Sequence, residues 1–270
     1  MSSPREKTIS SAANPLFREL LDLLASKGVK KQSRFLLFGE KVVRDALSAR
    51  GAADALVLVT VEGAGDASLE RLLPGEASIL RLTKPLFAEL DVFGTHASVL
   101  VCPVPKVPDW TAEAPAGLEV LLALSDPSNL GASLRSAAAF GASKIVLLRE
   151  SASPFHPKAT RAASGLTLST PFERGPSIRE LPEFLSSKRG TAGNASVFAL
   201  DMAGSPLAEV SWPRAGARLL LGEEGQGLPA DLVTQRIAIP MVPGVESLNA
   251  AASLAVALYA WRSSARPRVG

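Results

Sequence analysis

The sequence predicts an α/β protein with two domains. Three observations support this prediction: short apolar runs alternate with amphipathic helical patterns, a proline-rich stretch interrupts them near residue 105, and 47% of the 270 residues are hydrophobic. That apolar fraction is enough to give each of two ordinary domains a core. We therefore expect a first domain at 1–104, a linker at 105–117 and a second domain at 118–270.

The first domain opens with a helical pattern. Ser10 or Ser11 is expected to start a helix that carries leucines at helical spacing and ends by Gly28. Residues 30–34 are expected to form a basic turn. The following elements alternate, which predicts a small α/β domain. In order, they are an apolar run at 35–38, a helix at 39–47, a strand at 55–61, a helix at 69–73, a strand at 78–82, a helix at 85–90 and a strand at 98–102.

The second domain continues the alternation after the linker prolines. Parallel strands connected by helices bind their ligands beyond the carboxyl ends of the strands, so loops at those ends are the candidate sites. The expected elements are a strand at 119–124, a loop at 126–131, a helix at 132–140 that ends at Gly141, a strand at 144–148, a loop with a short helix at 154–165, a helix at 181–185, strands at 197–200, 219–221 and 237–239, and an alanine-rich helix after residue 249.

Charge is concentrated near the start of the chain. Residues 1–50 hold ten basic and five acidic side chains, whereas the whole chain has a net charge of only +3. An early basic surface suits a polyanion such as a nucleic acid. A solvated helix face would give the same composition, so charge leaves both interpretations open.

Composition argues against several classes of protein. Cys102 is the only cysteine, and with His96 and His156 as the only histidines a Cys/His zinc site is not expected. The sequence has no apolar run of about 18 residues, so we expect no membrane span. The first residues lack the apolar core of a secretory signal, and a reducing cytoplasmic location is expected.

Three loops at expected strand ends contain residues that packing alone does not require. In the first, Asn129 is placed to cap a helix and Gly131 allows a ligand to approach the backbone. The second, residues 222–227, lacks the Gly-Lys-Ser/Thr ending of a phosphate-binding loop and follows a late strand. The third, residues 243–249, has Ser247 and Asn249 as candidate caps. Taken singly, each loop is also explained as an ordinary cap or turn.

Taken together, the three loops resemble the three sequence motifs of the SpoU (TrmH-like) ribose methyltransferases of the SPOUT superfamily. The resemblance covers essentially all of the second domain, and residues 11–15 and 38–40 resemble the start of the small substrate-binding domain of many members. The motif residues are Asn129, Gly131, Arg135 and Ala137 in the first loop, Gly222, Glu224, Gly227 and Leu228 in the second, and Ile239-Pro240-Met241 with Ser247-Leu248-Asn249 in the third.

This resemblance implies a fold that the residue patterns do not predict. Family members have a parallel α/β catalytic domain whose C-terminal segment forms a deep trefoil knot, a feature that ordinary topology rules would exclude. The resemblance also implies S-adenosylmethionine as cofactor, a homodimer, and a small N-terminal α/β domain that binds RNA. No metal is implied.

The resemblance also implies roles for individual residues. Because a guanidinium stays protonated, we expect Arg135 chiefly to stabilise the developing alkoxide and to hold a phosphate. Asn129 is expected to position the ribose or Arg135. The implied catalytic residues are Arg135, Asn129, Glu224, Ser247 and Asn249. The implied cofactor-binding residues are Leu200, Gly222, Glu223, Ile239, Ser247 and Leu248.

The function implied is S-adenosylmethionine-dependent methylation of a ribose 2′-hydroxyl. Ribosomal RNA is the favoured substrate, because a small domain in front of the catalytic domain is typical of the family's ribosomal RNA enzymes. A tRNA 2′-O-methyltransferase and a non-catalytic RNA-binding member of the fold are the alternatives. A nicotinamide dehydrogenase has only the α/β pattern and the glycines in its favour.

Two segments depart from the family pattern. Residues 161–165, Arg-Ala-Ala-Ser-Gly, stand where many relatives have Arg-Ala-Ser-x-Gly, so the serine is shifted. Residues 93–98 replace a Gln-Gly that relatives often have near the end of the first domain. The way in which the first domain contacts RNA therefore does not follow from the resemblance.

Overall fold

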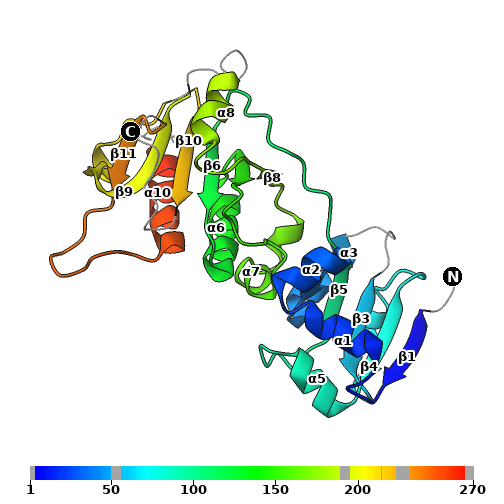
Figure 1. Cartoon of the computed structure of the whole chain (residues 1–270). Helices are drawn as coiled ribbons and strands as arrows, with labels where there is room; N and C mark the ends of the chain where they lie inside the picture. Colours follow the sequence, from blue (N-terminus) through cyan, green and yellow to red (C-terminus); the bar gives the residue numbers. More distant parts are fainter. Residues whose placement is uncertain (1–3, 50–55, 189–194, 214, 223–231, 265–270) are drawn as a thin grey trace. The chain divides into compact units, whose positions relative to one another are not determined.

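The computed structural model describes residues 4–49, 56–188, 195–213, 215–222 and 232–264 (Figure 1). These residues form two compact units. Unit 1 consists of residues 1–106 with 153–169, and unit 2 consists of residues 107–152 with 170–270. Each unit contains one β-sheet, so we describe them separately.

Unit 1 is built on a mixed five-stranded sheet with the order β1-β4-β3-β5-β2. Strand β4 pairs in parallel with β1 and β3, whereas β5 runs antiparallel to β3 and β2. Its strands are β1 (Arg5–Ile9), β2 (Arg34–Leu37), β3 (Val57–Val61), β4 (Ser78–Leu82) and β5 (Val99–Pro103). Its helices are α1 (Pro15–Asp22), α2 (Ser26–Gln32), α3 (Glu40–Ala49), α4 (Ala67–Glu70), α5 (Lys84–Leu90) and α7 (Pro157–Ala162), with the 3-10 helix η1 (Leu166–Leu168).

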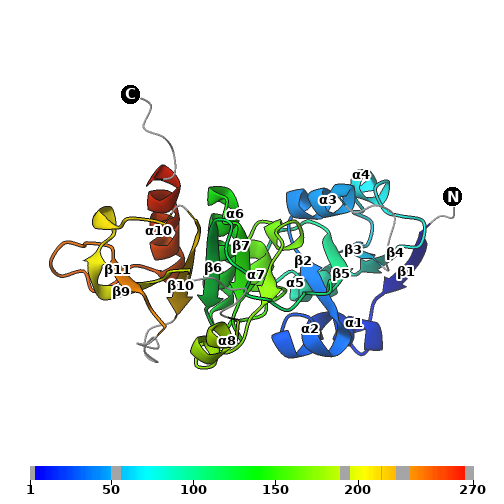
Figure 2. The same cartoon turned by 90° about the horizontal axis from the view of Figure 1, so that it is seen from above.

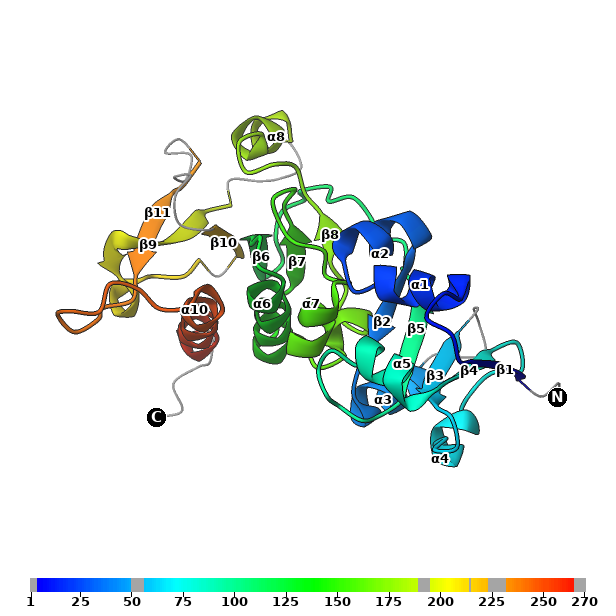
Figure 3. The same ribbon diagram turned by 60° about the horizontal axis from the view of Figure 1, so that its bottom comes forward.

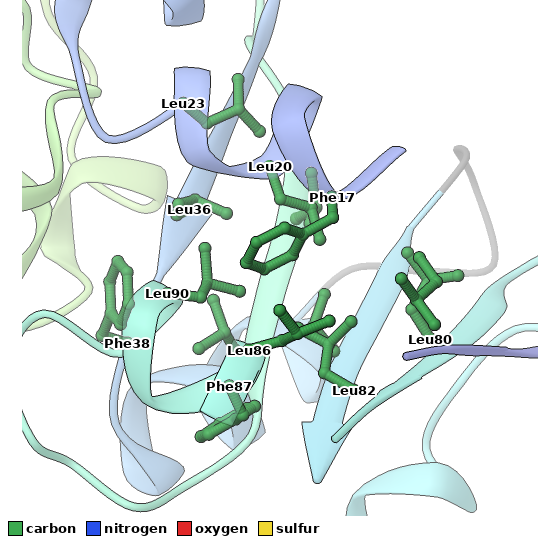
Figure 4. Close-up of a cluster of buried hydrophobic side chains, with 14 residues drawn as sticks. Phe17, Leu20, Leu23, Leu36, Phe38, Leu80, Leu82, Leu86, Phe87 and Leu90 are labelled. Atoms are coloured by element: carbon green, nitrogen blue, oxygen red, sulfur yellow. The ribbon is translucent and has the colours of Figure 1, made fainter. Parts of the chain in front are cut away.

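A hydrophobic cluster holds α1 and α5 against this sheet (Figure 4). Phe17 and Leu20 from α1 meet Leu90 from α5 and alternate residues of the strands, such as Leu36 and Leu82. Alternation along a strand places every second side chain on the same face, which is why these residues share one core. Burying a large apolar side chain contributes roughly 1.5–3 kcal/mol.

The first helix differs from its prediction at both ends. Asn14, not a serine, caps α1, with its Oδ1 accepting from the N–H of Leu16 at 2.9 Å. The helix ends at Asp22, and Gly28 lies inside the separate helix α2. A Cβ at residue 28 would lie 1.9 Å from the carbonyl oxygen of Asp22, so only glycine allows this approach. Most of the expected basic turn is therefore the end of α2.

Residues 153–169 pack with unit 1. The ring of Phe155 lies 5.0 Å from that of Phe35, and Thr160 Oγ1 donates to the carbonyl of Leu36 at 3.3 Å. The predicted range 118–270 assigns this segment to the second domain. Packing assigns it to unit 1, because its helix α7 covers strand β2.

Unit 2 is a parallel sheet, which confirms the predicted α/β class. Its six strands have the order β11-β9-β10-β6-β7-β8, and every neighbouring pair is parallel. Its strands are β6 (Leu118–Ala123), β7 (Lys144–Leu147), β8 (Glu173–Arg174), β9 (Val197–Pro206), β10 (Ala217–Gly222) and β11 (Gln235–Ala238). Its helices are α6 (Pro127–Phe140), α8 (Leu181–Ser187) and α10 (Ala250–Ser264), with the 3-10 helix η2 (Leu207–Glu209).

Helices cover both faces of this sheet. Helices α6 and α10 lie side by side on one face, and α8 lies on the other (Figures 2 and 3). Alanines in both helices let their backbones approach closely. At the end of α6 the ring of Phe140 meets that of Tyr259 from α10, edge to face at 6.2 Å.

The predicted linker is largely part of unit 2. Trp110 is buried, and its backbone N–H donates to the carbonyl of Arg174 at 2.8 Å. Arg218 donates from Nη2 to the carbonyl of Glu113 at 2.7 Å and from Nε to Glu119 at 3.0 Å. These bonds hold the second half of the predicted linker against β10 and β6.

The Arg218–Glu119 ion pair is buried between neighbouring strands. The two residues are directly opposite in the β10–β6 register, and their side chains are only 2% and 3% exposed. Burial raises the pKa of Glu119, and the positive charge of Arg218 opposes that rise. A charge pair so far from water depends on both partners.

Two further predictions concern topology and membranes. Residues 223–231, which contain most of the second motif, lie outside the described residues, so the trefoil knot stays a prediction. In the ranges that the structure does describe, no helix is long and apolar enough to cross a bilayer.

Candidate functional site

The carboxyl ends of the parallel strands of unit 2 bring the first and third motif segments, with Gly222 of the second, to one edge of the sheet. Helix α6 follows β6 directly, and the loop 239–249 leads from β11 into α10. Because all six strands run in the same direction, the ends of β6, β9, β10 and β11 lie at the same edge. The candidate site is built there.

Helix α6 begins earlier than predicted. Asp126 is its N-cap, and the Asp126 carboxylate accepts from the backbone N–H of Asn129 at 2.7 Å. The prediction that Asn129 caps the helix was therefore wrong. Pro127 occupies the first helical position, where its missing N–H costs nothing, and this favours a cap at the residue before it. The side chain of Asn129 therefore takes no part in capping α6.

Helix α10 is capped by Asn249, one of the two caps considered for this loop. Its Oδ1 accepts from the N–H groups of Ala251 at 3.0 Å and Ala252 at 3.3 Å. Such a cap stabilises a helix by about 1 kcal/mol. The same interaction fixes the amide, because the oxygen faces the helix and the nitrogen must point away.

One hydrogen bond joins the first motif to the third. Asn249 Nδ2 donates to Asn129 Oδ1 at 2.8 Å, across 120 residues of sequence. Each amide thus has a defined orientation. In the part of the chain that the structure describes, nothing accepts from Nδ2 of Asn129, so this donor is available to a ligand at the strand ends.

Arg135 lies further along α6. It is exposed and follows Asn129 by six residues, which is about 9 Å along the axis and about 120° around it. Long side chains on a helix point back toward its N-terminus, so the Arg135 guanidinium is directed toward the turn that contains Gly131 and Ala132. Arg135 and Asn129 therefore lie on different faces of α6, and the assignment of Arg135 to the site stays a prediction.

Strand β9 bulges out of the sheet beside the site. Ala199 pairs with Arg236 of β11, but the next pair joins Ser205 to Ile237, so residues 200–204 bulge out of the ladder. Asp201 forms an ion pair with Arg236, and its carboxylate also accepts from the N–H of Ala203 at 2.9 Å. Bulges often occur beside active sites because they turn the backbone toward a ligand. This bulge was not predicted from the sequence.

Glycine is required at residue 204, directly before β9 pairs with β11 again. A Cβ at Gly204 would lie 2.5 Å from the backbone of Arg236 and Ile237. The dipeptide Ala203-Gly204 after an apolar run was the only local signal for this close contact.

Three of the residues implied to bind the cofactor lie in or directly after three neighbouring strands. Leu200, half-buried, begins the β9 bulge, Gly222 ends β10, and Ile239 follows the last residue of β11. Ser247 and Leu248 are exposed in the loop before α10. Since the strand order is β11-β9-β10, these backbones are neighbours at the sheet edge.

Two of the implied residues, Glu223 and Glu224, lie outside the described residues. Their positions therefore stay predictions. Among the residues that the structure describes, no three His, Cys, Asp or Glu side chains gather as a metal site would require.

Comparison with known proteins gives a consistent result. The model of the SpoU rRNA Methylase family matches residues 119–259. The chain is 40% identical to the ribosomal RNA small subunit methyltransferase G 2 of Syntrophobacter fumaroxidans over 96% of its own length, but it spans only 49% of that protein. It is 29% identical to the 23S rRNA (guanosine(2553)-2′-O)-methyltransferase of Bacillus subtilis over 94% of its own length and 98% of the relative's.

A solved structure shares the fold along almost the whole chain. The rRNA methyltransferase of Sinorhizobium meliloti aligns with a TM-score of 0.78 and 22% identity, covering 97% of this chain and all of the other. The AdoMet-bound structure of an rRNA methyltransferase from that organism aligns with a TM-score of 0.73 and 24% identity, covering 97% of this chain and 99% of the other.

Proposed function

We propose a function from the premise that this chain belongs to the SpoU rRNA Methylase family: it transfers a methyl group from S-adenosylmethionine to a ribose 2′-hydroxyl of RNA. The observation that carries the proposal is the hydrogen bond between Asn249 and Asn129. It links the first and third motifs at the edge of the sheet where the ends of β9, β10 and β11 meet.

The residues at that edge suit S-adenosylmethionine. Leu200 lies where β9 bulges, Gly222 ends β10 and Ile239 follows β11, and the backbone groups of these three residues on adjacent strands can bind the polar edges of an adenine and an amino acid. Apolar side chains are uncovered on the surrounding loops, and a purine ring and an aliphatic chain would shield them. They are Met202, Val242, Val245 and Leu248, which are 64%, 70%, 46% and 40% exposed.

The bound cofactor would supply a methyl group on a sulfonium. The ribose 2′-oxygen would displace the neutral thioether in line, and the hydroxyl proton would pass to solvent. The protein's contribution is mainly alignment of the hydroxyl with that methyl. We assign Arg135 to stabilise the developing alkoxide and to hold a neighbouring phosphate, since its guanidinium presents several donors. Within the described residues Nδ2 of Asn129 has no acceptor, so it can orient the ribose, and Asn249 holds Asn129 in place.

The remaining predicted residues have supporting roles. Ser247 lies two residues before Asn249 in the same exposed loop, where it can position the cofactor or the loop itself. Glu224 and Glu223 are assigned to orient Arg135 and the cofactor, respectively. These two assignments rest on the second motif alone.

Ribosomal RNA is the proposed substrate. The relatives from S. fumaroxidans and B. subtilis are named as ribosomal RNA methyltransferases, and the latter as a 2′-O enzyme. A tRNA substrate is the second candidate. Ribosomal RNA as substrate also favours a cytoplasmic location.

A homodimer is part of the proposal. Val256 and Tyr259 lie one turn apart on α10 and are 41% and 63% exposed. Apolar side chains that share one face of a helix at that exposure are suited to a partner surface. A second copy of the chain, packed on α10, would cover them.

Mapping ribose methylation tests the proposed function. Ribosomal and transfer RNA from cells with and without the gene would be compared for 2′-O-methyl sites. We expect one ribosomal site to disappear and to return with the wild-type gene but not with an Arg135→Ala gene. An unchanged methylation map would contradict the proposal, and a lost tRNA site would move it to the second candidate.

Calorimetry gives an independent test of the cofactor. The purified protein should bind S-adenosylmethionine and should show no heat of binding with NAD. Binding of NAD alone would favour a dehydrogenase instead.

A further inference from the structure

Unit 1 carries a group of side chains that brings two distant segments together. Arg161 of α7 lies over the ring of Phe93, with its guanidinium carbon 4.6 Å from the ring centroid. Phe93 lies in the loop that joins α5 to β5. Lys158 lies one turn before Arg161 on α7, and His96 lies three residues after Phe93. We call Phe93, His96, Lys158 and Arg161 the basic–aromatic surface.

The loop that carries Phe93 is held in one conformation. The buried carboxylate of Asp91 accepts from the backbone N–H of His96 at 2.7 Å and from Thr95 Oγ1 at 3.1 Å. His96 has a φ of 52°, a left-handed conformation that this bond stabilises. The ring of Phe38 meets the Phe93 ring edge to face, with centroids 5.0 Å apart. The loop therefore presents Phe93 in a fixed orientation.

Helix α7 is anchored as firmly. Its hydrogen bond from Thr160 to β2 and the contact between Phe155 and Phe35 attach it to the sheet of unit 1. His156 caps it, with Nδ1 accepting from the N–H of Lys158 at 3.1 Å. Lys158 and Arg161 therefore project from a rigid base, and less conformational entropy is lost when they bind a ligand.

The charges on this surface are not neutralised. Lys158 and Arg161 are exposed, and within the described ranges neither forms an ion pair. Asp91, the acid in this loop, is buried and already accepts two hydrogen bonds. A cationic face that contains a planar guanidinium backed by an aromatic ring suits an anionic chain with flat groups. Single-stranded RNA has both features, because its phosphates pair with Lys and Arg and its bases stack on aromatic rings and guanidinium planes.

We propose that the basic–aromatic surface binds a single-stranded segment of the RNA substrate, with a base stacked on the Arg161 guanidinium and a phosphate on Lys158. This proposal rests on the proposed function for the nature of the substrate. It gives residues 153–169 a role in RNA binding, because this segment contains both Lys158 and Arg161 and belongs to unit 1.

The test compares two double variants that remove the same charge. Lys158→Ala/Arg161→Ala removes the two cations of the basic–aromatic surface from α7, which packs on β2 at one edge of the sheet. Arg5→Ala/Lys7→Ala removes two exposed cations from β1, the strand at the opposite edge of the same sheet. Affinity would be measured by fluorescence anisotropy with a labelled 20-nucleotide single-stranded RNA of mixed sequence, over a series of salt concentrations. Methylation would be measured on unmodified small- and large-subunit rRNA transcripts from the source organism.

We expect the Lys158/Arg161 variant to bind the RNA about tenfold more weakly than wild type, as loss of a stacked base and a phosphate contact predicts. The slope of log affinity against log salt should fall by about 0.7 for each lost phosphate contact. The KM for the rRNA transcript that is methylated should rise, while affinity for S-adenosylmethionine and kcat at saturating RNA stay at wild-type values. The Arg5/Lys7 variant should change RNA affinity by less than about twofold, as expected for exposed charges outside the contact.

Equal losses in the two double variants would overturn the proposal, because they would show only a general charge effect. Arg161→Lys keeps the charge but removes the planar group, so it should restore the salt dependence without restoring full affinity; full recovery would overturn the stacking contact. Unchanged RNA affinity in the Lys158/Arg161 variant would favour a different partner for this surface. A wild-type protein that neither binds RNA nor methylates it would instead count against the proposed function itself.

Discussion

At the scale of single residues, two asparagines determine the geometry of the candidate site. Asn249 uses its oxygen to cap α10 and its nitrogen to reach Asn129, so one side chain both starts a helix and links two motifs. Asn129 is available for this contact because Asp126 caps α6. An amide suits the position of Asn249, because it has an acceptor and a donor at opposite ends of one planar group.

The two roles of Asn249 can be separated by substitution. Asn249→Ser keeps a capping oxygen but is too short to reach Asn129, whereas Asn249→Ala loses both interactions. We expect both variants to lower the methylation rate by about tenfold, the effect of one lost hydrogen bond. Only Asn249→Ala should also lower the free energy of unfolding, by about 1 kcal/mol. Urea denaturation and single-turnover methylation would measure the two effects, and wild-type turnover in Asn249→Ser would contradict the positioning role.

Arg135 is expected to affect turnover without affecting the fold. Loss of one group that stabilises charge in a transition state typically costs a factor of about 100 or more. Arg135→Ala should therefore lower kcat at least about 100-fold while cofactor affinity is kept. Arg179→Ala, which removes another exposed arginine from unit 2, is the matched control. Wild-type kcat in Arg135→Ala would exclude the catalytic assignment.

At the scale of elements, the sequence predicted whether a segment is a helix or a strand better than it predicted where that segment begins and ends. The predicted strand at 78–82 is β4, residue for residue, and the helix expected at 85–90 is α5. In contrast, β1 was not predicted, because Arg-Glu-Lys-Thr-Ile has almost no apolar periodicity and only Ile9 is buried. It is a strand because β4 supplies hydrogen-bond partners along its whole length. Helix α2 was missed because it is short and contains Gly28.

The strands of unit 2 depend on a buried charge pair that local patterns do not predict. Removing Arg218 leaves the Glu119 carboxylate buried without its partner, so Arg218→Met should cost about 3–5 kcal/mol of unfolding free energy at pH 7. The double variant Arg218→Met/Glu119→Leu should recover most of that loss. Arg149→Met, which breaks the exposed pair with Glu180, is the control and should cost less than about 1 kcal/mol.

The loss of unfolding free energy caused by Arg218→Met should also depend on pH. Burial raises the pKa of Glu119 above its ordinary value of 4.5, and removing Arg218 raises that pKa further. A group with a raised folded-state pKa contributes its full stability below the unfolded value and loses it as pH rises through the folded value. The loss relative to wild type should therefore be small at about pH 4.5 and should grow toward pH 7. Urea denaturation across this range would measure it, and an equal loss at both ends would refute the explanation.

At the scale of the whole molecule, contacts rather than chain order define the two units. In the sequence, residues 153–169 lie between β7 and β8, which are strands of unit 2. In the structure they pack on β2 of unit 1. Residues 107–117 run as a strap along unit 2, with Trp110 buried against Phe184. A proline-rich composition predicted the boundary near residue 105, but it could not indicate that most of the stretch is packed.

The proposed homodimer belongs to this scale as well. Val256→Asp would place a charge in the apolar face of α10, and a buried unpaired charge is strongly unfavourable. We expect wild type to have the mass of two chains by light scattering and Val256→Asp to have the mass of one. Leu72→Asp, at a comparable exposure in unit 1, should stay dimeric. A monomeric wild-type protein would rule out the dimer.

By itself the sequence determined the class of fold and the family motifs, and it predicted a boundary near residue 105, because helical and strand periodicity and short motifs are properties of neighbouring residues. Only the tertiary structure decided that Asn129 meets Asn249, that Arg218 lies opposite Glu119, and that α7 covers β2. The members of each pair are separated by about a hundred residues or more. Such contacts are set by strand order and by the packing of whole faces, and no window of local sequence contains that information.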